Sequence, residues 1–338
     1  MKTVFEGNTA NEAWLNGLSS LHNCSNALLQ DSRLGPTREI LHSSFIIRNP
    51  RERWVISRAP AMNPAFAIAE VFWILAGMNE SKFINFWNPS LTKFAGKGSI
   101  YHGAYGERLR KRFGFDQLIR AADTLRSNPN SRQVVLQIWD PRDDFPNNDG
   151  SPVAEDIPCN ICAMPKVRNG RLEWLQVMRS NDLFLGSPHN FVQFTSLQEI
   201  MAGWLECDVG SYVQVADSLH CYEKDITNFG QEEIKYNPQN SDDLRLTFKE
   251  FEVTFTQSIN ILRRLVSDDL TKYEIRKLPS HNIQPSYLNM LLICAVDSAR
   301  RRRWGKEMRE LITYCTNPIL VEMWARWLDR CTKNKSTG

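Results

Sequence analysis

The chain has 338 residues, of which 42% are hydrophobic and 23% charged, and its formal net charge is +3. Such a chain has ample apolar material for a core, and its near-neutral charge excludes a globally basic nucleic-acid-binding surface. No apolar run reaches the ~18 residues of a membrane helix, and the N-terminal segment lacks the apolar core of a signal peptide. We therefore expect a cytoplasmic protein with neither a membrane nor a nucleic acid as partner.

The eight cysteines are irregularly spaced, which is not typical of a disulfide scaffold. Cys159 and Cys162 form one CxxC pair, with no second pair or histidine cluster nearby. The pair lies in a strand-like segment, where alternation would place the two thiols on opposite faces. We therefore expect no metal site.

Hydrophobic spacing predicts several elements in the first part of the chain. Residues 11–30 are a predicted helix, followed by a loop interrupted by glycine and proline. Ile40–Ile47 and Trp54–Ser57 are predicted strands, and Pro64–Ala76 is a helix that is apolar nearly all round and hence buried. Glu70 is the only carboxylate of that helix. Composition leaves two interpretations open, a hydrogen-bonded structural carboxylate or an acid or base inside a site.

Residues 88–106 are glycine-rich and predict an irregular loop, and residues 141–158 are acidic and proline-rich and predict a surface excursion. Asn169-Gly170 separates two alternating runs, which is a strong signal for a hairpin. The elements predicted around these segments are the strands Val134–Trp139, Cys159–Val167, Leu172–Met178 and Gly210–Ala216 and the helix Asn190–Trp204.

The last third changes character, and we expect a core over residues 1–230 followed by a mainly helical region over residues 231–338. The predicted helices there are Phe248–Val266, Tyr287–Arg302 and Lys306–Arg330. The run Arg300–Arg303 has two interpretations. It is either a phosphate or RNA patch or a set of cations placed at the negative end of a helix dipole.

The stretch from Asp156 to Tyr222 carries the residues most suited to chemistry. A cysteine thiolate that adds to C6 of a pyrimidine makes C5 nucleophilic, which requires a lowered thiol pKa and suits Cys159 if arginines lie nearby. Arg179 and Ser180 offer a guanidinium and a hydroxyl for phosphate oxygens. Asn190 carries both a donor and an acceptor, which match O4 and N3–H of uracil.

His220 and Tyr222, two residues apart on a strand, face one side and suit a sugar hydroxyl. Each of these residues also has an ordinary structural explanation when it is taken alone. The order and spacing of the set are more specific than its members. Together the motifs resemble the family of thymidylate synthase and deoxycytidylate hydroxymethylase. The resemblance is clearest over residues 131–222, weaker over residues 15–106, and absent after Asp225.

The resemblance implies a role for each matched position. Cys159 is the expected nucleophile, Glu70 organises proton transfer, and Tyr105 lies beside the cysteine. Arg179 and Ser180 bind phosphate together with Arg33 of the N-terminal loop, and Arg132 reaches the phosphate of a partner subunit. Asn190 reads the base, and His220 and Tyr222 hold the sugar. Asp182 and Trp87 are the expected cofactor contacts.

Several positions depart from the synthases. Asn160 follows the nucleophile where synthases usually carry histidine, and we count it among the catalytic positions. Gln133 replaces a second phosphate arginine, and the short C-terminal segment that closes over folate is not recognisable in Cys331–Gly338. Met178 and Ser218 stand in motifs nearer to those of the hydroxymethylases.

The resemblance implies an α+β fold with a large mixed sheet covered by helices, a homodimer and the cofactor 5,10-methylenetetrahydrofolate. The expected activity is one-carbon transfer to C5 of a pyrimidine nucleoside monophosphate, with uracil preferred and a 5-hydroxymethyl or 5-methyl product. A lid that excludes water favours methyl transfer, so its absence favours hydroxymethylation. The alternatives are a plain thymidylate synthase and a non-catalytic nucleotide-binding member that acts through its C-terminal helices.

Overall fold

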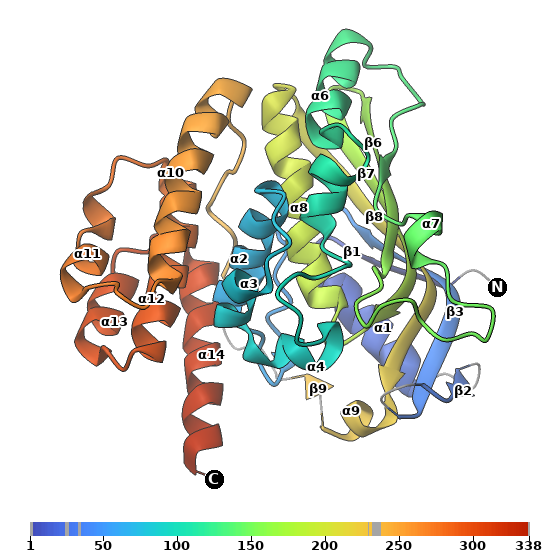
Figure 1. Cartoon of the computed structure of the whole chain (residues 1–338), viewed down its shortest axis with the longest axis horizontal. Helices are drawn as coiled ribbons and strands as arrows, with labels where there is room; N and C mark the ends of the chain where they lie inside the picture. The colour runs from blue at the N-terminus through green and yellow to red at the C-terminus, as the bar shows by residue number, and fades with distance from the viewer. Residues whose placement is uncertain (1–2, 24–26, 33–34, 229, 232–237, 337–338) are drawn as a thin grey trace.

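The computed structural model describes residues 3–23, 27–32, 35–228, 230–231 and 238–336. Its centre is a seven-stranded mixed sheet in the order β1-β3-β8-β7-β6-β5, with β2 also paired to β3 (Figure 1). The strands are β1 Thr3–Gly7, β2 Leu28–Gln30, β3 Thr37–Ile47, β5 Leu136–Gln137, β6 Asn160–Arg168, β7 Arg171–Asp182 and β8 Asp208–Tyr222. β7 and β8 run parallel, whereas β8 is antiparallel to β3 and β7 to β6. The α+β prediction is confirmed.

Helices cover one face of this sheet in successive layers (Figure 1). α1 Ala10–Asn23 and α8 Ser187–Trp204 pack on the strands, α2 Pro64–Leu75 packs on α8, and α12 Pro285–Arg301 packs on α2. The remaining helices are α3 Ser81–Trp87, α4 Thr92–Ala95, α5 Tyr105–Glu107, α6 Gln117–Ser127, α7 Pro141–Asp144, α9 Glu223–Asn228, α10 Phe248–Val266, α11 Lys272–Arg276, α13 Gly305–Ile312 and α14 Pro318–Ser336. A separate small sheet pairs β4 Arg58–Ala59 with β9 Gly230–Gln231.

The two inner helices are buried almost completely. In α2 every residue except Glu70 is buried, and in α8 every residue except His189 is buried. α2 starts sharply because Asn63 caps it, its Oδ1 accepting from the backbone N–H groups of Ala65 and Phe66. A helix without a polar face needs cover on all sides, which here comes from α8 on one side and α12 on the other.

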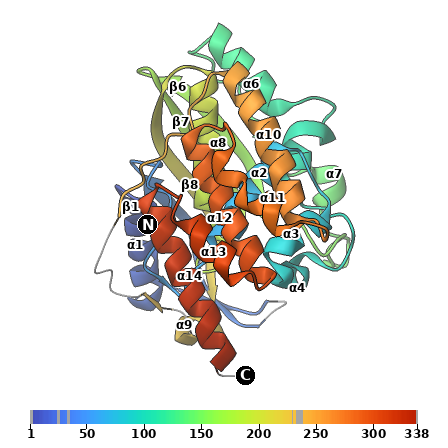
Figure 2. The same cartoon turned by 90° about the vertical axis from the view of Figure 1, so that its left-hand side faces the viewer.

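The C-terminal helices share the core of the rest of the chain, and Figure 2 shows α12 in front of α2. The Phe72 ring of α2 stacks on Phe255 of α10 with 6.1 Å between centroids, and Tyr287 of α12 meets Phe72 edge-on. The buried carboxylate of Glu199 on α8 accepts from the backbone N–H of Leu244, 3.1 Å away, in the segment that leads to α10. Within the described residues, no helix is long and apolar enough to cross a membrane.

The predicted strand Trp54–Ser57 is wrong, because these residues form an extended segment and turn outside any sheet. Both neighbouring positions on β3 are taken, by β8 on one side and by β1 and β2 on the other. Trp54, Val55 and Ile56 are nonetheless buried in the core. The apolar run therefore reports burial rather than strand pairing, which periodicity cannot separate over so short a segment.

The predicted helix Lys306–Arg330 is also wrong as a single element. α13 ends at Ile312 and α14 starts at Pro318, whose preceding residue Asn317 is buried. The Asn317 amide donates to Asp242 Oδ2 at 2.6 Å, so the break is anchored to the segment before α10. Proline suits the first turn of a new helix and disfavours continuation of the old one.

Candidate active site

A cleft of about 1150 Å³ opens where the C-terminal ends of β7 and β8 meet the inner helices. Its wall includes most of the residues that the sequence singled out. They are Glu70, Trp87, Tyr105, Cys159, Arg179, Ser180, Asp182, Asn190, His220 and Tyr222. Arg33 lies outside the described residues. Arg132, which is exposed, and Asn160, which is buried, are not among the residues that line this cleft.

Cys159 lies immediately before β6 and is held against β7, where the Arg179 N–H donates to its carbonyl at 2.9 Å. The Arg179 guanidinium also donates to the carbonyls of Pro158 at 2.9 Å and Ile157 at 3.1 Å. Burial raises the pKa of the Cys159 thiol, the Arg179 charge opposes that rise, and Asp156 and Asp182 add to it. The expected lowered pKa is therefore wrong for the chain alone, because burial outweighs the arginine.

Tyr105 and Asn160 flank the thiol. Tyr105 begins α5, which approaches α2 so closely that a Cβ on Gly106 would lie 2.6 Å from the Ile74 carbonyl oxygen. Burial raises the pKa of the Tyr105 hydroxyl, and hydrogen bonding with Asn160 opposes the rise. The Asn160 Oδ1 accepts from Gln176 Nε2 at 2.9 Å, which fixes this buried amide beside the nucleophile.

Glu70 and His189 are the two residues that escape burial in α2 and α8, and they meet across the cleft. His189 Nδ1 lies 3.4 Å from Glu70 Oε2, and the imidazole packs edge-on against Phe66. Both atoms are buried, and neither has a hydrogen-bond partner among the described residues. The pair places a carboxylate beside an imidazole on the lining of the cleft. His189 was not predicted, although the sequence places it beside Asn190.

The parallel register of β7 and β8 brings together a polar wall of the cleft, formed by Ser180, Asp182, Ser218, His220 and Tyr222. Ser180 pairs with Ser218 and Asp182 with His220, so the ends of both strands present their side chains together. His220 and Tyr222 meet edge-on with 5.8 Å between ring centroids. Asn190, in the first turn of α8, donates through Nδ2 to Gln193 Oε1 at 3.3 Å.

At the end of β7, Asp182 shapes the turn that leads into α8. Its Oδ1 accepts from the backbone N–H groups of Phe184 at 2.8 Å and Leu185 at 2.6 Å, whereas Oδ2 is buried and unpartnered among the described residues. Burial raises the Asp182 pKa, and the His220 charge opposes the rise. Both side-chain amide atoms of Asn181 are likewise buried without a partner there. The unpartnered Asp182 oxygen fits an N–H donor of a ligand such as a pterin, and the Asn181 amide can both donate and accept there. Trp87 lines the same cleft.

Sequence patterns missed several residues of this wall. Asp156 accepts at Oδ2 from the Gly103 N–H at 2.8 Å, and burial raises its carboxyl pKa. Arg58, from β4, is buried and donates to the Phe184 carbonyl at 2.7 Å. The C-terminal helices add Arg300, Arg301, Trp327, Arg330 and Cys331. The run Arg300–Arg303 stands out in the sequence, but no sequence pattern connects it with the cleft.

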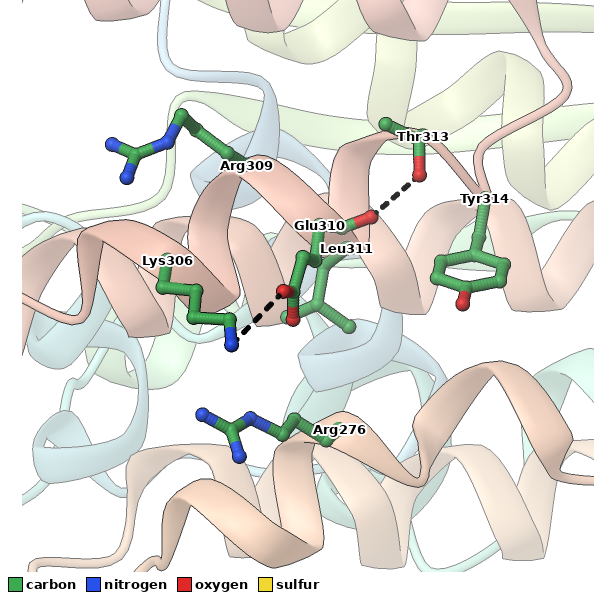
Figure 3. Close-up of a pocket in the computed structure, with 7 residues that line it drawn as sticks. All are labelled: Arg276, Lys306, Arg309, Glu310, Leu311, Thr313 and Tyr314. Atoms are coloured by element: carbon green, nitrogen blue, oxygen red, sulfur yellow. Dashed lines mark hydrogen bonds and ion pairs between the residues drawn. The ribbon is translucent and has the colours of Figure 1, made fainter.

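A second hollow of about 430 Å³ lies between α11 and α13, away from these residues (Figure 3). Its cations are largely matched by carboxylates, since Arg276 pairs with Glu307 and Lys306 lies 3.7 Å from Glu310. It contains none of the predicted site residues. In the described ranges, no group of three or more histidine, cysteine, aspartate or glutamate residues is placed to hold a metal ion.

The family model described as thymidylate synthase matches residues 55–271. The chain belongs to the thymidylate synthase family. The match extends beyond Asp225, where the sequence motifs ended, and takes in α10. α12, α13 and α14 lie outside it.

Curated relatives support the same placement. The chain is 37% identical over 199 residues to a deoxyuridylate hydroxymethyltransferase of Bacillus phage SP01, covering 56% of this chain and 51% of the relative. It is 32% identical to the protein of the same name from Pseudomonas phage M6, over 58% of this chain and 55% of the relative. A thymidylate synthase of Francisella philomiragia is 26% identical over 49% of this chain and 64% of the relative. The chain thus spans about half the length of the phage relatives.

Proposed function

We propose that this protein transfers a one-carbon unit to C5 of deoxyuridine monophosphate and releases 5-hydroxymethyldeoxyuridine monophosphate. One observation carries the proposal: a nucleophile, an acid–base pair, a phosphate cation and a base reader line a single cleft. These are Cys159, Glu70 with His189, Arg179 and Asn190. The names of the phage relatives support the choice of substrate and product.

In this proposal the nucleotide lies along the polar wall. The Arg179 guanidinium and the Ser180 hydroxyl bind phosphate oxygens beside the nucleophile, and His220 and Tyr222 hold the sugar hydroxyl. The phosphate would also offset the charge of Arg179. Orientation of the pyrimidine over Cys159 then comes from contacts at both ends of the nucleotide.

Asn190 supports uracil as the base. Because its Nδ2 donates to Gln193, its Oδ1 is left to accept from a ligand. Uracil presents an N3–H donor to such an acceptor, whereas cytosine presents an unprotonated N3 acceptor that would meet oxygen with oxygen. The remaining Nδ2 hydrogen suits the O4 oxygen of uracil.

The chemistry assigned to the chain begins with Cys159, whose sulfur adds to C6 and makes C5 nucleophilic. Asp182 and Trp87 would hold methylenetetrahydrofolate, which would supply the one-carbon unit at the oxidation level of formaldehyde and leave as tetrahydrofolate. Glu70 and His189 accept the proton that leaves C5 and the proton that the entering water loses. The Tyr105 hydroxyl positions hydrogen-bonding groups beside the sulfur. Elimination of the Cys159 sulfur then restores the C5=C6 bond.

Hydroxymethylation requires water to reach the one-carbon unit on C5. Asp156 and Asn160 place polar groups beside Cys159, which favours a held water there. The second candidate is a plain thymidylate synthase, favoured by the name of the matching family and of other relatives. A purely nucleotide-binding role would require neither Cys159 nor the Glu70–His189 pair.

We further propose a homodimer that packs sheet against sheet. A stripe of half-buried apolar residues lies in register on the sheet face away from α8: Met164, Leu175, Val177, Val213 and Val215. Arg179 follows Leu175 and Val177 at the same alternation, so a partner on this stripe would come close to the phosphate end of the cleft. The exposed Arg132 is then free to complete the partner's phosphate site.

The test is turnover of purified protein with methylenetetrahydrofolate and dUMP, UMP, dCMP or CMP, followed by product mass. The proposal expects a gain of CH₂O on dUMP. A gain of CH₂ would replace it with the synthase, and no product from any nucleotide would overturn both enzymes. Cys159→Ala should abolish product formation, and retained activity in that variant would refute the mechanism.

A further inference from the structure

The part of the cleft nearest the predicted cofactor contacts is completed by helices outside the matched family region. α12 contributes Arg300 and Arg301 at its C-terminal end, and α14 contributes Arg330. We call Arg300, Arg301 and Arg330 the arginine wall. Its members reach the same cleft as Trp87 and Asp182.

Each member of the wall is held in place. Arg300 and Arg301 donate through Nε to the two oxygens of the buried Asp297 carboxylate, at 2.8 and 2.7 Å. Arg301 also donates to the Trp87 carbonyl, and so connects the wall directly to a predicted cofactor residue. Three of the five N–H groups of a guanidinium remain after two such contacts, which leaves donors for a ligand.

Arg330 is fixed by its contact with the Ala61 carbonyl, 2.6 Å from Nη1, and its guanidinium lies 5.1 Å from the centre of the Trp327 ring. Arg58 adds a fourth cation on the same wall, donating to the Pro60 carbonyl next to Ala61. Burial lowers the pKa of Arg58 to about 10, and the charge of Arg330 contributes to that shift. Two guanidinium groups that repel each other in a cleft create a site for an anion.

The carboxylates around the wall do not balance it. The Asp297 carboxylate pairs with two arginines, Arg300 and Arg301. Asp182 and Asp225 favour the charged form of Arg58, but burial raises the pKa of both carboxyl groups. Trp327 provides a flat apolar surface between the guanidiniums of Arg300 and Arg330. Such a surface suits an aromatic group that carries carboxylates.

We infer that the arginine wall binds the glutamate carboxylates of the folate donor, so that α12 and α14 form the tail subsite of the cofactor. This inference rests on the proposed function, because it assigns the pterin end of the same ligand to Asp182 and Trp87. It gives the C-terminal helices a binding role on the cleft that the matched family region does not contain.

The test compares donors that carry one and three glutamates in the wild type, Arg330→Gln and Arg300→Gln. A charge-assisted hydrogen bond contributes ~1.5–3 kcal/mol, so each substitution should raise the KM for the triglutamate donor by about tenfold or more. The KM for the nucleotide should change little. Arg330→Lys, which keeps the charge, should recover part of the affinity. Arg309→Gln is the matched control, since Arg309 is an exposed arginine of the second hollow (Figure 3).

Binding measured without turnover separates this inference from the proposed function. Quenching of tryptophan fluorescence by tetrahydrofolate mono- and triglutamate gives the two dissociation constants directly. Tighter binding of the triglutamate that is lost in Arg330→Gln and retained in Arg309→Gln supports the wall, even if no nucleotide is converted. Equal dissociation constants for the mono- and triglutamate in the wild type would overturn it, as would an unchanged preference in folded Arg330→Gln and Arg300→Gln.

Discussion

The Cys159 thiol lies between charges of opposite sign, and each can be removed separately. Asp156 raises the thiol pKa and Arg179 lowers it. Asp156→Asn should therefore move the titration of Cys159 to lower pH, because loss of a negative neighbour stabilises the thiolate. Arg179→Gln should move it to higher pH, because loss of the guanidinium charge destabilises the thiolate. The rate of iodoacetamide alkylation at Cys159, followed by mass spectrometry against pH, measures both shifts.

Asp149→Asn is the control for that pair, since Asp149 is an exposed aspartate of the excursion over residues 141–158. It should leave the alkylation profile unchanged. Shifts of the same sign in Asp156→Asn and Arg179→Gln would contradict the electrostatic account, because opposite charges cannot act alike on one thiolate.

Glu70 and His189 should control reaction rate more than nucleotide affinity. Glu70→Gln keeps the size and polarity of the side chain but removes its capacity as a base. Loss of a general base usually lowers turnover by 10²–10⁴-fold, so kcat should fall by about that factor. Calorimetry should give a nucleotide dissociation constant close to that of the wild type. Glu80→Gln, at an exposed glutamate before α3, should keep full activity, and an equally active Glu70→Gln would remove Glu70 from the mechanism.

Sequence motifs predicted those residues of the cleft that stand in local signatures. Cys159, Arg179 and Asn190 lie within one stretch of the chain, and all of them line the cleft. The sign of the Cys159 pKa shift could not be predicted, because burial is a property of the whole fold. His189 had one usable signal, a titratable side chain in an otherwise buried helix. Arg330 had none, since only tertiary packing brings α14 to the cleft.

At the scale of elements, one buried ion-pair cluster ties the central layer to its surroundings. Glu199 of α8 faces Arg53, Arg51 at 3.1 Å and the backbone N–H of Leu244. Glu199→Ala should lower the free energy of unfolding by about 3–5 kcal/mol, because it leaves a buried guanidinium uncompensated. Urea denaturation followed by circular dichroism measures the loss.

The exposed Glu252 of α10 is the matched control, and Glu252→Ala should change the unfolding free energy by less than about 0.5 kcal/mol. A loss below about 1 kcal/mol in Glu199→Ala would show that the two arginines find other partners or solvent.

Elements that are bounded by characteristic turn residues were predicted correctly. Asn169 and Gly170 both take the left-handed conformation, with φ of 51° and 71°, as the predicted hairpin turn requires. Trp54–Ser57 was mispredicted because its alternation-free apolar run fits a strand and a buried coil equally. The long pattern over Lys306–Arg330 concealed a break, because Asn317 is anchored to Asp242 by a contact that no local pattern reports.

For the whole molecule, we predict a single unfolding transition. The regions on either side of residue 230 differ in composition, but α2 packs between α8 and α12, and Phe72 contacts Phe255. Neither region can unfold alone without exposing a buried helix to water. Tryptophan fluorescence and circular dichroism should therefore give coincident denaturation curves. Two separate transitions would instead establish an autonomous C-terminal domain.

The near-complete burial of α2 also has an evolutionary consequence. A helix wrapped on both sides can accept polar residues only where it borders a cavity, and in this chain that position is Glu70. A relative that lacks a counterpart of α12 would leave the outer side of this helix in water. Such a relative should therefore carry a polar stripe there, at helical spacing, while keeping the acidic position. The composition of one early helix would then reveal, from sequence alone, which members of the family have gained a C-terminal layer.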